Sequence, residues 1–193
     1  MNLISLFCVC IYLLLANLTT VIICNKTFGK CLPLTMMMQA FIIYLSQINK
    51  LEFLPNVLTA LKSLQQNGYK LIIITNQSGI GRKYFTVDDY NKFNSYMLNK
   101  MKQNGVLIDK VYYCPHTDSD NCDCRKPKTK LFEQAIDEYN VDLYNSYAIG
   151  DNDRDLAICD ITPINGIILG KKSKKYIQKR DLYEASNYIL KNK

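Results

Sequence analysis

Four side chains that commonly bind metal ions lie close together near the middle of the chain. Cys114 and His116 form a C-x-H pair, and Cys122 and Cys124 form a C-x-C pair after a short loop. Two close pairs of thiolate and imidazole ligands suit a closed, tetrahedral structural zinc site, whereas Mg²⁺ and Ca²⁺ prefer oxygen. The alternatives are chance cysteine pairs or a disulfide in a surface loop. We favour zinc because the only histidine of the chain falls inside the cluster.

Two cations follow this cluster directly, in the tripeptide Arg125-Lys126-Pro127. A zinc loop would hold the chain rigid just before them. Arginine can grip a phosphate with its planar fork, and lysine can act as a point charge. Taken alone, the tripeptide is better explained as a solvated basic turn. The rest of the chain favours a phosphate-binding role.

Composition predicts one well-buried domain with a modest positive charge. The 193 residues carry a formal net charge of +7, and the first 51 contain lysines but no acidic residue. This balance fits a small phosphorylated substrate and does not require nucleic acid. Three of the eight cysteines belong to the ligand cluster, which favours the reducing cytoplasm over an oxidising compartment.

The segment 3–24 is apolar, uncharged and long enough to span a bilayer, so a membrane anchor or signal sequence is one interpretation. No Lys or Arg precedes it, which argues against a signal peptide, and the polar interruption around Asn17 argues against an anchor. Thr20 to Cys24 alone could instead form a buried parallel strand. Cytoplasmic localisation is expected, with membrane anchoring through 3–24 as the alternative.

From Lys50 onward the pattern alternates between helices and strands. Pro55 and Gly68 bracket a helical repeat of leucines, and Thr86 with Asp89 three residues later predicts the start of a second helix. Such alternation indicates βαβ units, and therefore an α/β fold with a parallel sheet covered on both faces. The predicted strands are 70–75, 106–113, 145–149 and 166–169, and the predicted helices are 55–68, 86–101, 130–139 and 181–190.

Polar clusters fall at the carboxyl ends of three predicted strands, where ligands bind in such sheets. They are Thr75-Asn76-Gln77, Arg125-Lys126 and the acidic run from Asp151 to Asp155. A hydroxyl, an amide, cations and carboxylates at one edge would suit a phosphate and a divalent metal. Each cluster has an ordinary explanation, a turn or a helix N-terminus. Their coincidence at successive strand ends favours a site.

These motifs resemble the haloacid dehalogenase superfamily of phosphatases, specifically the group with the histidinol-phosphate and heptose-bisphosphate phosphatases. The matching stretches are Ile74-Thr-Asn-Gln-Ser-Gly-Ile, Cys-Pro-His…Cys-Asp-Cys-Arg-Lys-Pro and Ile149-Gly-Asp-Asn-Asp-Arg-Asp. The resemblance covers about 50–169 and implies a Rossmann-like parallel sheet with a zinc-binding loop. It divides the chain into an atypical apolar N-terminal segment, 1–49, and a phosphatase-like domain, 50–193.

The resemblance also implies a role for each site residue. Thr75 would hydrogen-bond the transferred phosphoryl group, Lys126 would neutralise its charge, and Asp151 would bind a catalytic Mg²⁺. Asn76 and Arg125 would orient the substrate. The structural zinc ion would be held by Cys114, His116, Cys122 and Cys124. A cation and a metal together would offset the charge of the phosphoryl transition state.

The superfamily's first motif, Asp-x-Asp-Gly, is missing. Its first aspartate is the nucleophile, yet here the first acidic residue is Glu52 and the first aspartate is Asp88. Asn25 and Thr27 could mark a decayed motif, in a loose alignment. The explanations are a non-native N-terminus, a pseudoenzyme that binds phosphate without cleaving it, or a substitute nucleophile for which no candidate is evident. We expect a phosphatase domain that is inactive or impaired.

Two other functions remain open. A polynucleotide 3′-phosphatase shares the superfamily fold, and the basic tract 171–180 could contact a nucleic-acid backbone, although a solvated surface loop is favoured. A non-catalytic binding or scaffold protein is the alternative from a different class. The short step from His116 to Cys122 resembles the histidinol-phosphate type more, but heptose phosphatases also have short loops, so the substrate stays open. The sequence does not fix the oligomeric state.

Overall fold

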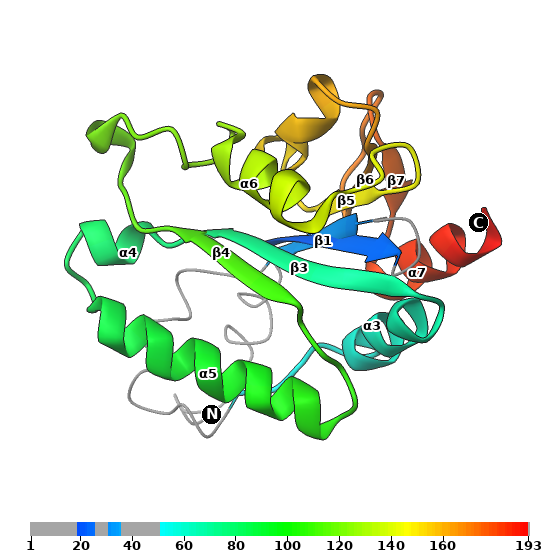
Figure 1. Ribbon diagram of the computed structural model, residues 1–193, viewed down its shortest axis with the longest axis horizontal. Helices are drawn as coiled ribbons and strands as arrows, with labels where there is room; N and C mark the ends of the chain where they lie inside the picture. The colour runs from blue at the N-terminus through cyan, green and yellow to red at the C-terminus, as the bar shows by residue number, and fades with distance from the viewer. Residues whose placement is uncertain (1–18, 26–30, 36–50, 193) are drawn as a thin grey trace, which may run out of the picture.

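The computed structural model describes residues 19–25, 31–35 and 51–192, which form one mixed sheet with helices on both faces (Figure 1). This architecture confirms the predicted α/β, Rossmann-like class. The strands are β1 (Thr19–Asn25), β2 (Cys31–Thr35), β3 (Tyr69–Asn76), β4 (Lys110–Cys114), β5 (Tyr147–Gly150), β6 (Asn165–Leu169) and β7 (Ile177–Lys179). The helices are α3 (Val57–Gln66), α4 (Ser78–Gly81), α5 (Val87–Gln103), α6 (Lys130–Tyr139) and α7 (Leu182–Lys191), with 3₁₀ turns η2 (Asp118–Asp120) and η3 (Asp153–Asp160).

The strand order is β4-β3-β2-β1-β5-β6-β7, and β1 also pairs with β3. Neighbouring strands are parallel in the pairs β2–β3, β3–β4, β5–β6 and β6–β7. The predicted parallel sheet is therefore confirmed for most of its width. The exception is β1, which runs antiparallel to β2, β3 and β5.

The direction of β1 corrects one prediction. The apolar run from Thr20 to Cys24 does form a strand, but it is antiparallel to its neighbours rather than parallel. In this register Thr19 lies opposite Thr75, and Asn25 lies opposite Tyr69. Asn25 is thus at the end of the sheet remote from Thr75, so its alignment with the missing aspartate motif is wrong. Thr27 lies outside the described residues.

Alternating side chains of the strands fill two cores, one on each face of the sheet. In β3, Leu71 and Ile73 face a core built with α3, α5 and α7, whereas Ile72 and Ile74 face a core built with α6 and η3. This is the pattern expected for a strand buried on both sides. In α5, Met97 and Met101 are buried in the first of these cores.

A local side-chain signal sets the start of α5. The Thr86 hydroxyl accepts a hydrogen bond from the backbone N–H of Asp89 at 3.1 Å, and the Asp89 carboxylate accepts one from the Thr86 N–H at 3.0 Å. This capping box starts α5 as predicted. Helix α6 has the predicted bounds, Lys130–Tyr139. Strand β4 begins later than expected, at Lys110 rather than Val106, and β7 was not predicted.

The predicted membrane segment and the predicted boundary after residue 49 both concern the N-terminal part of the chain. Within the described residues, no helix combines the length and apolar character needed to cross a bilayer. Most of the apolar segment 3–24, namely residues 3–18, lies outside the described residues. The boundary between 1–49 and 50–193 stays a prediction.

Candidate functional site: a cysteine-histidine cluster beside a buried lysine

The four predicted zinc ligands come together after β4. The sulfur of Cys124 lies 3.2 Å from that of Cys114, 3.5 Å from that of Cys122 and 3.2 Å from Nδ1 of His116. Cys114 Sγ also lies 3.6 Å from both Cys122 Sγ and His116 Nδ1. Ligands of one tetrahedral zinc ion are separated by about 3.5–3.8 Å, given Zn–S and Zn–N distances of about 2.3 Å and 2.0 Å.

The donor set therefore fits a single zinc ion. All four ligand atoms lie within 4.8 Å of one another, and the three cysteines are free thiols, which excludes the disulfide alternative in this structure. Burial is the largest cause that raises the pKa of the Cys114 thiol above its ordinary value. A bound divalent cation has the opposite effect, because it stabilises the thiolate.

Backbone contacts fix this loop against the end of β3. The N–H of Gln77 donates to the Cys114 carbonyl at 2.7 Å, and that of Gly81 donates to the Pro115 carbonyl at 2.9 Å. A Cβ at Gly81 would lie 2.8 Å from that carbonyl oxygen, so the close approach requires glycine here. These backbone contacts thus join the cysteine loop, and the Arg125-Lys126 segment that follows it, to the end of β3.

The side chain of Lys126 is buried near the carboxyl end of β3, with only 2% of the residue's surface exposed. Its ammonium group forms an ion pair with Asp155 Oδ1 at 2.7 Å and donates to the Ile74 carbonyl at 2.9 Å. Burial lowers the pKa of Lys126, and the negative charge of Asp155 opposes that effect. A charge in this position needs compensation by carboxylates, and η3 supplies it.

Asn76 fixes the main chain of Lys126. Its amide oxygen accepts the Lys126 N–H at 3.0 Å, and its amide nitrogen donates to the Lys126 carbonyl at 3.2 Å. Both hydrogen bonds are buried, and they join the end of β3 to the turn after the cysteine cluster. Asn76 was predicted to orient substrate. The structure shows it positioning Lys126, and the predicted role in substrate binding stays untested.

Two carboxylates lie beside Lys126 at the end of β5. Asp151 is 6% exposed and Asp155 is fully buried. A Cβ at Gly150 would lie 2.5 Å from the Asp155 Cβ, so glycine at this position lets η3 approach the strand end. Burial raises the pKa of Asp151, and the charge of Asp155 raises it further.

These carboxylates carry more negative charge than Lys126 neutralises. Asp151 Oδ2 and both oxygens of Asp155 are shielded from solvent, and their contacts among the described residues are the ion pair of Asp155 with Lys126 and a hydrogen bond between the two carboxyl groups, which, in addition to burial, raises the pKa of Asp151. Buried carboxylate oxygens without donors are unfavourable unless a cation binds them. The arrangement therefore fits a divalent cation such as Mg²⁺, with Asp151 as predicted and Asp155 as a neighbour that the sequence analysis left without a separate role.

The remaining predicted residues have defined positions. Thr75 is buried, and its hydroxyl accepts a hydrogen bond from Gln77 Nε2 at 3.1 Å. Gln77 had no role assigned from sequence, since a glutamine in a turn is an ordinary occurrence. Arg125 makes two contacts with Asp118, at 2.6 Å from Nε and 3.3 Å from Nη2, so its guanidinium braces the cysteine loop. Its predicted contact with substrate stays untested.

The comparisons with known proteins agree with this geometry. The family model described as "Polynucleotide kinase 3 phosphatase" matches residues 32–191. The chain belongs to this phosphatase family. The match begins within β2 and ends with α7, so it includes the cysteine cluster, Lys126 and both buried carboxylates.

The similar proteins include heptose-bisphosphate phosphatases and a histidine biosynthesis protein. A probable D-glycero-D-manno-heptose-1,7-bisphosphate 7-phosphatase of Thermoplasma volcanium is 45% identical over 50% of this chain and 66% of its own length. The corresponding phosphatase of Haemophilus ducreyi is 38% identical over 68% of this chain and 76% of its own length. The histidine biosynthesis bifunctional protein HisB of Buchnera aphidicola is 38% identical over 67% of this chain, and only 37% of that longer protein is covered.

Solved structures support the same assignment. The D,D-heptose 1,7-bisphosphate phosphatase of B. bronchiseptica, crystallised with magnesium and phosphate, superposes with a TM-score of 0.70 at 25% identity, over 78% of this chain and 90% of that chain. A protein of Mesorhizobium loti described as a HAD-like phosphatase gives a TM-score of 0.67 at 22% identity, over 76% and 77% of the two chains, and supports the fold alone. The first structure agrees with the predicted resemblance to heptose-bisphosphate phosphatases, and the second agrees with the predicted fold.

Proposed function

We propose that this chain is a phosphatase-family domain that binds a small phosphorylated metabolite at the edge of the sheet around Lys126. The substrate classes suggested by its relatives are a heptose bisphosphate and histidinol phosphate. The observation that carries the proposal is the buried Lys126 ammonium, held between the Ile74 carbonyl and Asp155, beside the second buried carboxylate of Asp151. A cation and a metal-binding acid together suit a phosphoryl group.

The proposal gives each side chain a role. Thr75 hydrogen-bonds the phosphoryl group from the end of β3, and Lys126 neutralises its charge. Asn76 holds the Lys126 main chain in place. Asp151, with Asp155 beside it, holds Mg²⁺, which offsets negative charge on the phosphoryl oxygens. The zinc ion of the cysteine cluster has a structural role, because four protein ligands leave no open position for substrate.

Turnover is impaired in this proposal because a nucleophilic aspartate is missing. The first acidic residue of the sequence is Glu52, and an asparagine such as Asn25 cannot form an acyl-phosphate. Binding of phosphate and metal does not require that aspartate. The free thiols of the cysteine cluster fit a reducing compartment, so we place the protein in the cytoplasm.

Binding and turnover are tested separately. Isothermal titration with D-glycero-D-manno-heptose 1,7-bisphosphate and with histidinol phosphate, in the presence of Mg²⁺, measures affinity for each ligand. Phosphate release measures turnover. We expect saturable binding of at least one ligand that is lost in Asp151→Asn, and no Mg²⁺-dependent phosphate release above background. Clear turnover would disprove the impairment, and absence of binding to both ligands would disprove the proposed substrate classes.

A polynucleotide 3′-phosphatase is the second candidate, because the matching family model carries that description and the tract 171–180 is basic. A short oligonucleotide with a 3′-phosphate is the appropriate probe, with the 3′-hydroxyl form as its control. Binding that requires the 3′-phosphate and weakens steeply with added salt would favour this candidate over a small metabolite.

A further inference from the structure

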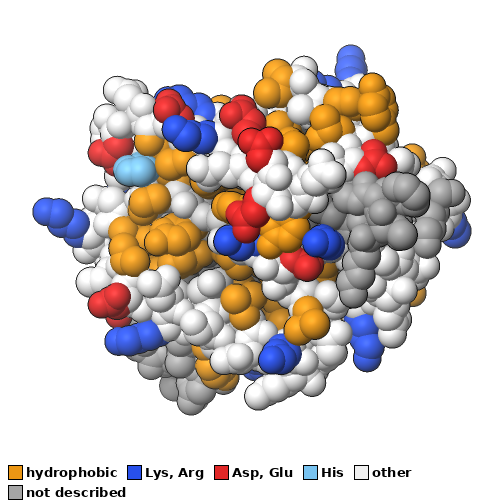
Figure 2. Space-filling model, in the orientation of Figure 1, with side chains coloured by type: hydrophobic (Ala, Val, Ile, Leu, Met, Phe, Trp, Pro, Cys, Tyr) orange, Lys and Arg blue, Asp and Glu red, His pale blue; other side chains and the backbone are white. Residues whose placement is uncertain are grey.

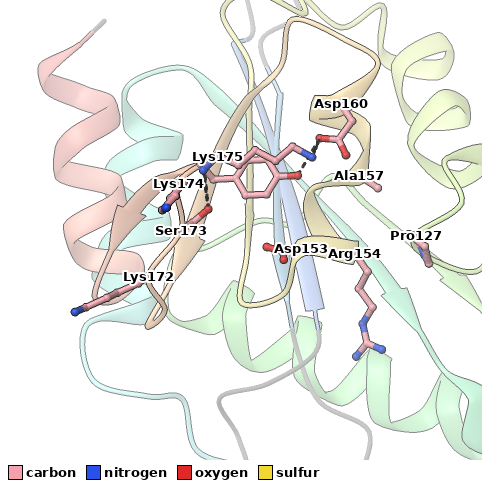
Figure 3. A pocket seen from close by; sticks show the side chains of 10 residues that line it. Pro127, Asp153, Arg154, Ala157, Asp160, Lys172, Ser173, Lys174 and Lys175 are labelled. Carbon is pink, nitrogen blue, oxygen red and sulfur yellow. Dashed lines mark hydrogen bonds and ion pairs between the residues drawn. The ribbon is translucent and has the colours of Figure 1, made fainter.

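A pocket lies beside the candidate phosphoryl site, between η3 and the segment that joins β6 to β7. Its volume is about 600 Å³, which is within the usual range for small-molecule sites. Pro127 follows the buried Lys126, and Asp153 and Arg154 follow Asp151, so the pocket and the site share both segments (Figure 3). The remaining lining residues are Ala157, Asp160, Lys172, Ser173, Lys174, Lys175 and Tyr176.

The charge of this pocket is positive. Asp160 is neutralised within the wall, because its carboxylate pairs with Lys175 at 2.5 Å and accepts a hydrogen bond from the Tyr176 hydroxyl at 2.9 Å. Arg154, Lys172 and Lys174 form no direct ion pair among the described residues, although Arg154 is near enough to Asp118 for its charge to lower the pKa of that carboxyl group. Asp153 is the only other acid in the lining. In Figure 3, Arg154 lies on the Pro127 side and the two lysines lie across from it.

Arg154 is the most informative of these cations. Its Nε is shielded from solvent and has no hydrogen-bond partner among the described residues. A shielded N–H without an acceptor is unfavourable, and a guanidinium group pairs readily with the oxygens of a phosphate. The exposed lysines alone would be ordinary surface charges. Figure 2 shows that basic and acidic side chains are mixed over the face it views, so charge alone would not mark a site. The unpaired Nε of Arg154 is the additional observation.

We propose that this pocket binds the anionic group of the substrate that does not react, with Arg154 as the residue that grips it and Lys172 and Lys174 at its rim. The inference rests on the proposed function and separates its two substrate classes. A sugar bisphosphate carries a second phosphate, which matches the positive pocket. Histidinol phosphate instead carries an amine on its non-reacting part, which the same charges repel. The pocket thus favours a bisphosphate over histidinol phosphate as the substrate.

The test compares ligands with and without the second phosphate. The 1,7-bisphosphate of D-glycero-D-manno-heptose, its 7-phosphate and histidinol phosphate are titrated into the wild type, Arg154→Gln and Arg180→Gln. Arg180 is the matched control, because it is an exposed arginine paired with Asp181 and Glu184 away from the pocket lining. We expect Arg154→Gln to weaken bisphosphate binding by about tenfold to a hundredfold. Binding of the 7-phosphate should be unchanged in all three proteins.

The outcomes separate the pocket from the phosphoryl site. Equal loss for both heptose ligands in Arg154→Gln would place Arg154 at the reacting phosphate and overturn the proposal, as would no loss for either. Tighter binding of histidinol phosphate than of the bisphosphate to the wild type would also overturn it. Circular dichroism of each variant confirms that the comparison is made between folded proteins.

A second measurement does not depend on the proposed function. The Nε–H signal of Arg154, assigned by its absence in Arg154→Gln, is followed by ¹H–¹⁵N NMR while inorganic phosphate is added to the wild type and to Asp151→Asn. A saturable shift of Arg154 but not Arg180 in both proteins supports an anion pocket even if neither heptose ligand binds. No shift beyond that of Arg180, or a shift that requires an intact Asp151, overturns it.

Discussion

Replacing Lys126 with methionine tests the charge balance at the centre of the site. Lys126→Met keeps most of the side-chain volume but removes the ammonium group that pairs with Asp155 at 2.7 Å and donates to the Ile74 carbonyl at 2.9 Å. Asp155 is fully buried, so its carboxylate would be left without compensation. Losing one partner of a buried ion pair destabilises a protein by about 3–5 kcal/mol.

A double variant separates the two contributions to this loss. In Lys126→Met combined with Asp155→Leu, both charges are absent and the hydrophobic side chains fill the space. Replacing both members of a buried ion pair with apolar groups is often nearly neutral, so we expect a stability within about 1–2 kcal/mol of wild type. The exposed pair of Lys130 and Asp123, 3.6 Å apart, provides a control. Lys130→Met should change stability by less than about 1 kcal/mol.

Urea unfolding monitored by circular dichroism gives the assay, in buffer without Mg²⁺ and without chelators that would strip zinc. With an m-value of about 2 kcal/mol/M, the single variant should lower the midpoint by roughly 2 M, and the double variant should recover most of that loss. If Lys126→Met loses no more stability than Lys130→Met, or if the double variant loses at least as much as the single, the buried charge balance described above does not exist in solution.

Three further predictions address the cluster, the strand end and the pocket wall. Purified protein should contain about one zinc ion per chain by atomic emission. Cys124→Ser should lose both zinc and stability, whereas the control Cys159→Ser should retain the metal. Equal zinc content in the two variants would contradict the assigned ligands. Gly150→Ala places a Cβ 2.5 Å from the Asp155 Cβ and should destabilise the protein by about 1–3 kcal/mol in the same urea assay, so an unchanged midpoint would argue against this close approach. The hydrogen bond from Lys175 is the largest cause that lowers the pKa of Asp160, so ¹³C NMR of the Asp160 carboxyl group should show a titration midpoint below the ordinary value of about 3.9. The small contribution of Asp160 to the free energy of unfolding should be present above that pH, and it should be lost as the pH falls through the lowered pKa. A midpoint at or above the ordinary value would refute that assignment.

The sequence alone could predict the parts of the structure that depend on nearby residues. The four metal ligands lie at the end of β4 and in the loop that follows it, so their spacing was sufficient to place them together. The Thr86–Asp89 capping box defined the start of α5, and α6 has the predicted bounds because its apolar repeat and flanking residues are local signals. The strand pattern also gave the correct fold class, since buried strands and amphipathic helices alternate along the chain.

Contacts between residues far apart in the chain could not be predicted from the sequence. Nothing in the acidic run from Asp151 to Asp155 indicates which carboxylate pairs with Lys126, and the clamp of Asn76 on the Lys126 main chain joins residues 50 positions apart. The direction of β1 could not be predicted either, because an apolar β-branched segment can pair parallel or antiparallel to its neighbours. Arg154 was read only as part of a motif. The pocket that it lines requires the segment after β6, which is distant in sequence.

The direction of β1 bears on the missing nucleophile. A strand parallel to β3 and β5 would bring its carboxyl end, and any aspartate that follows it, to the level of Thr75. In β1 the amino end lies there instead, because Thr19 pairs with Thr75. Strand β2 is parallel to β3, but methionines rather than acids follow it in the sequence. The buried acids at this edge among the described residues are Asp151 and Asp155, which follow β5. They suit a metal ion and the Lys126 ion pair, so the described residues of this edge supply groups that bind metal and phosphate, and they include no further buried acid that could attack a phosphoryl group.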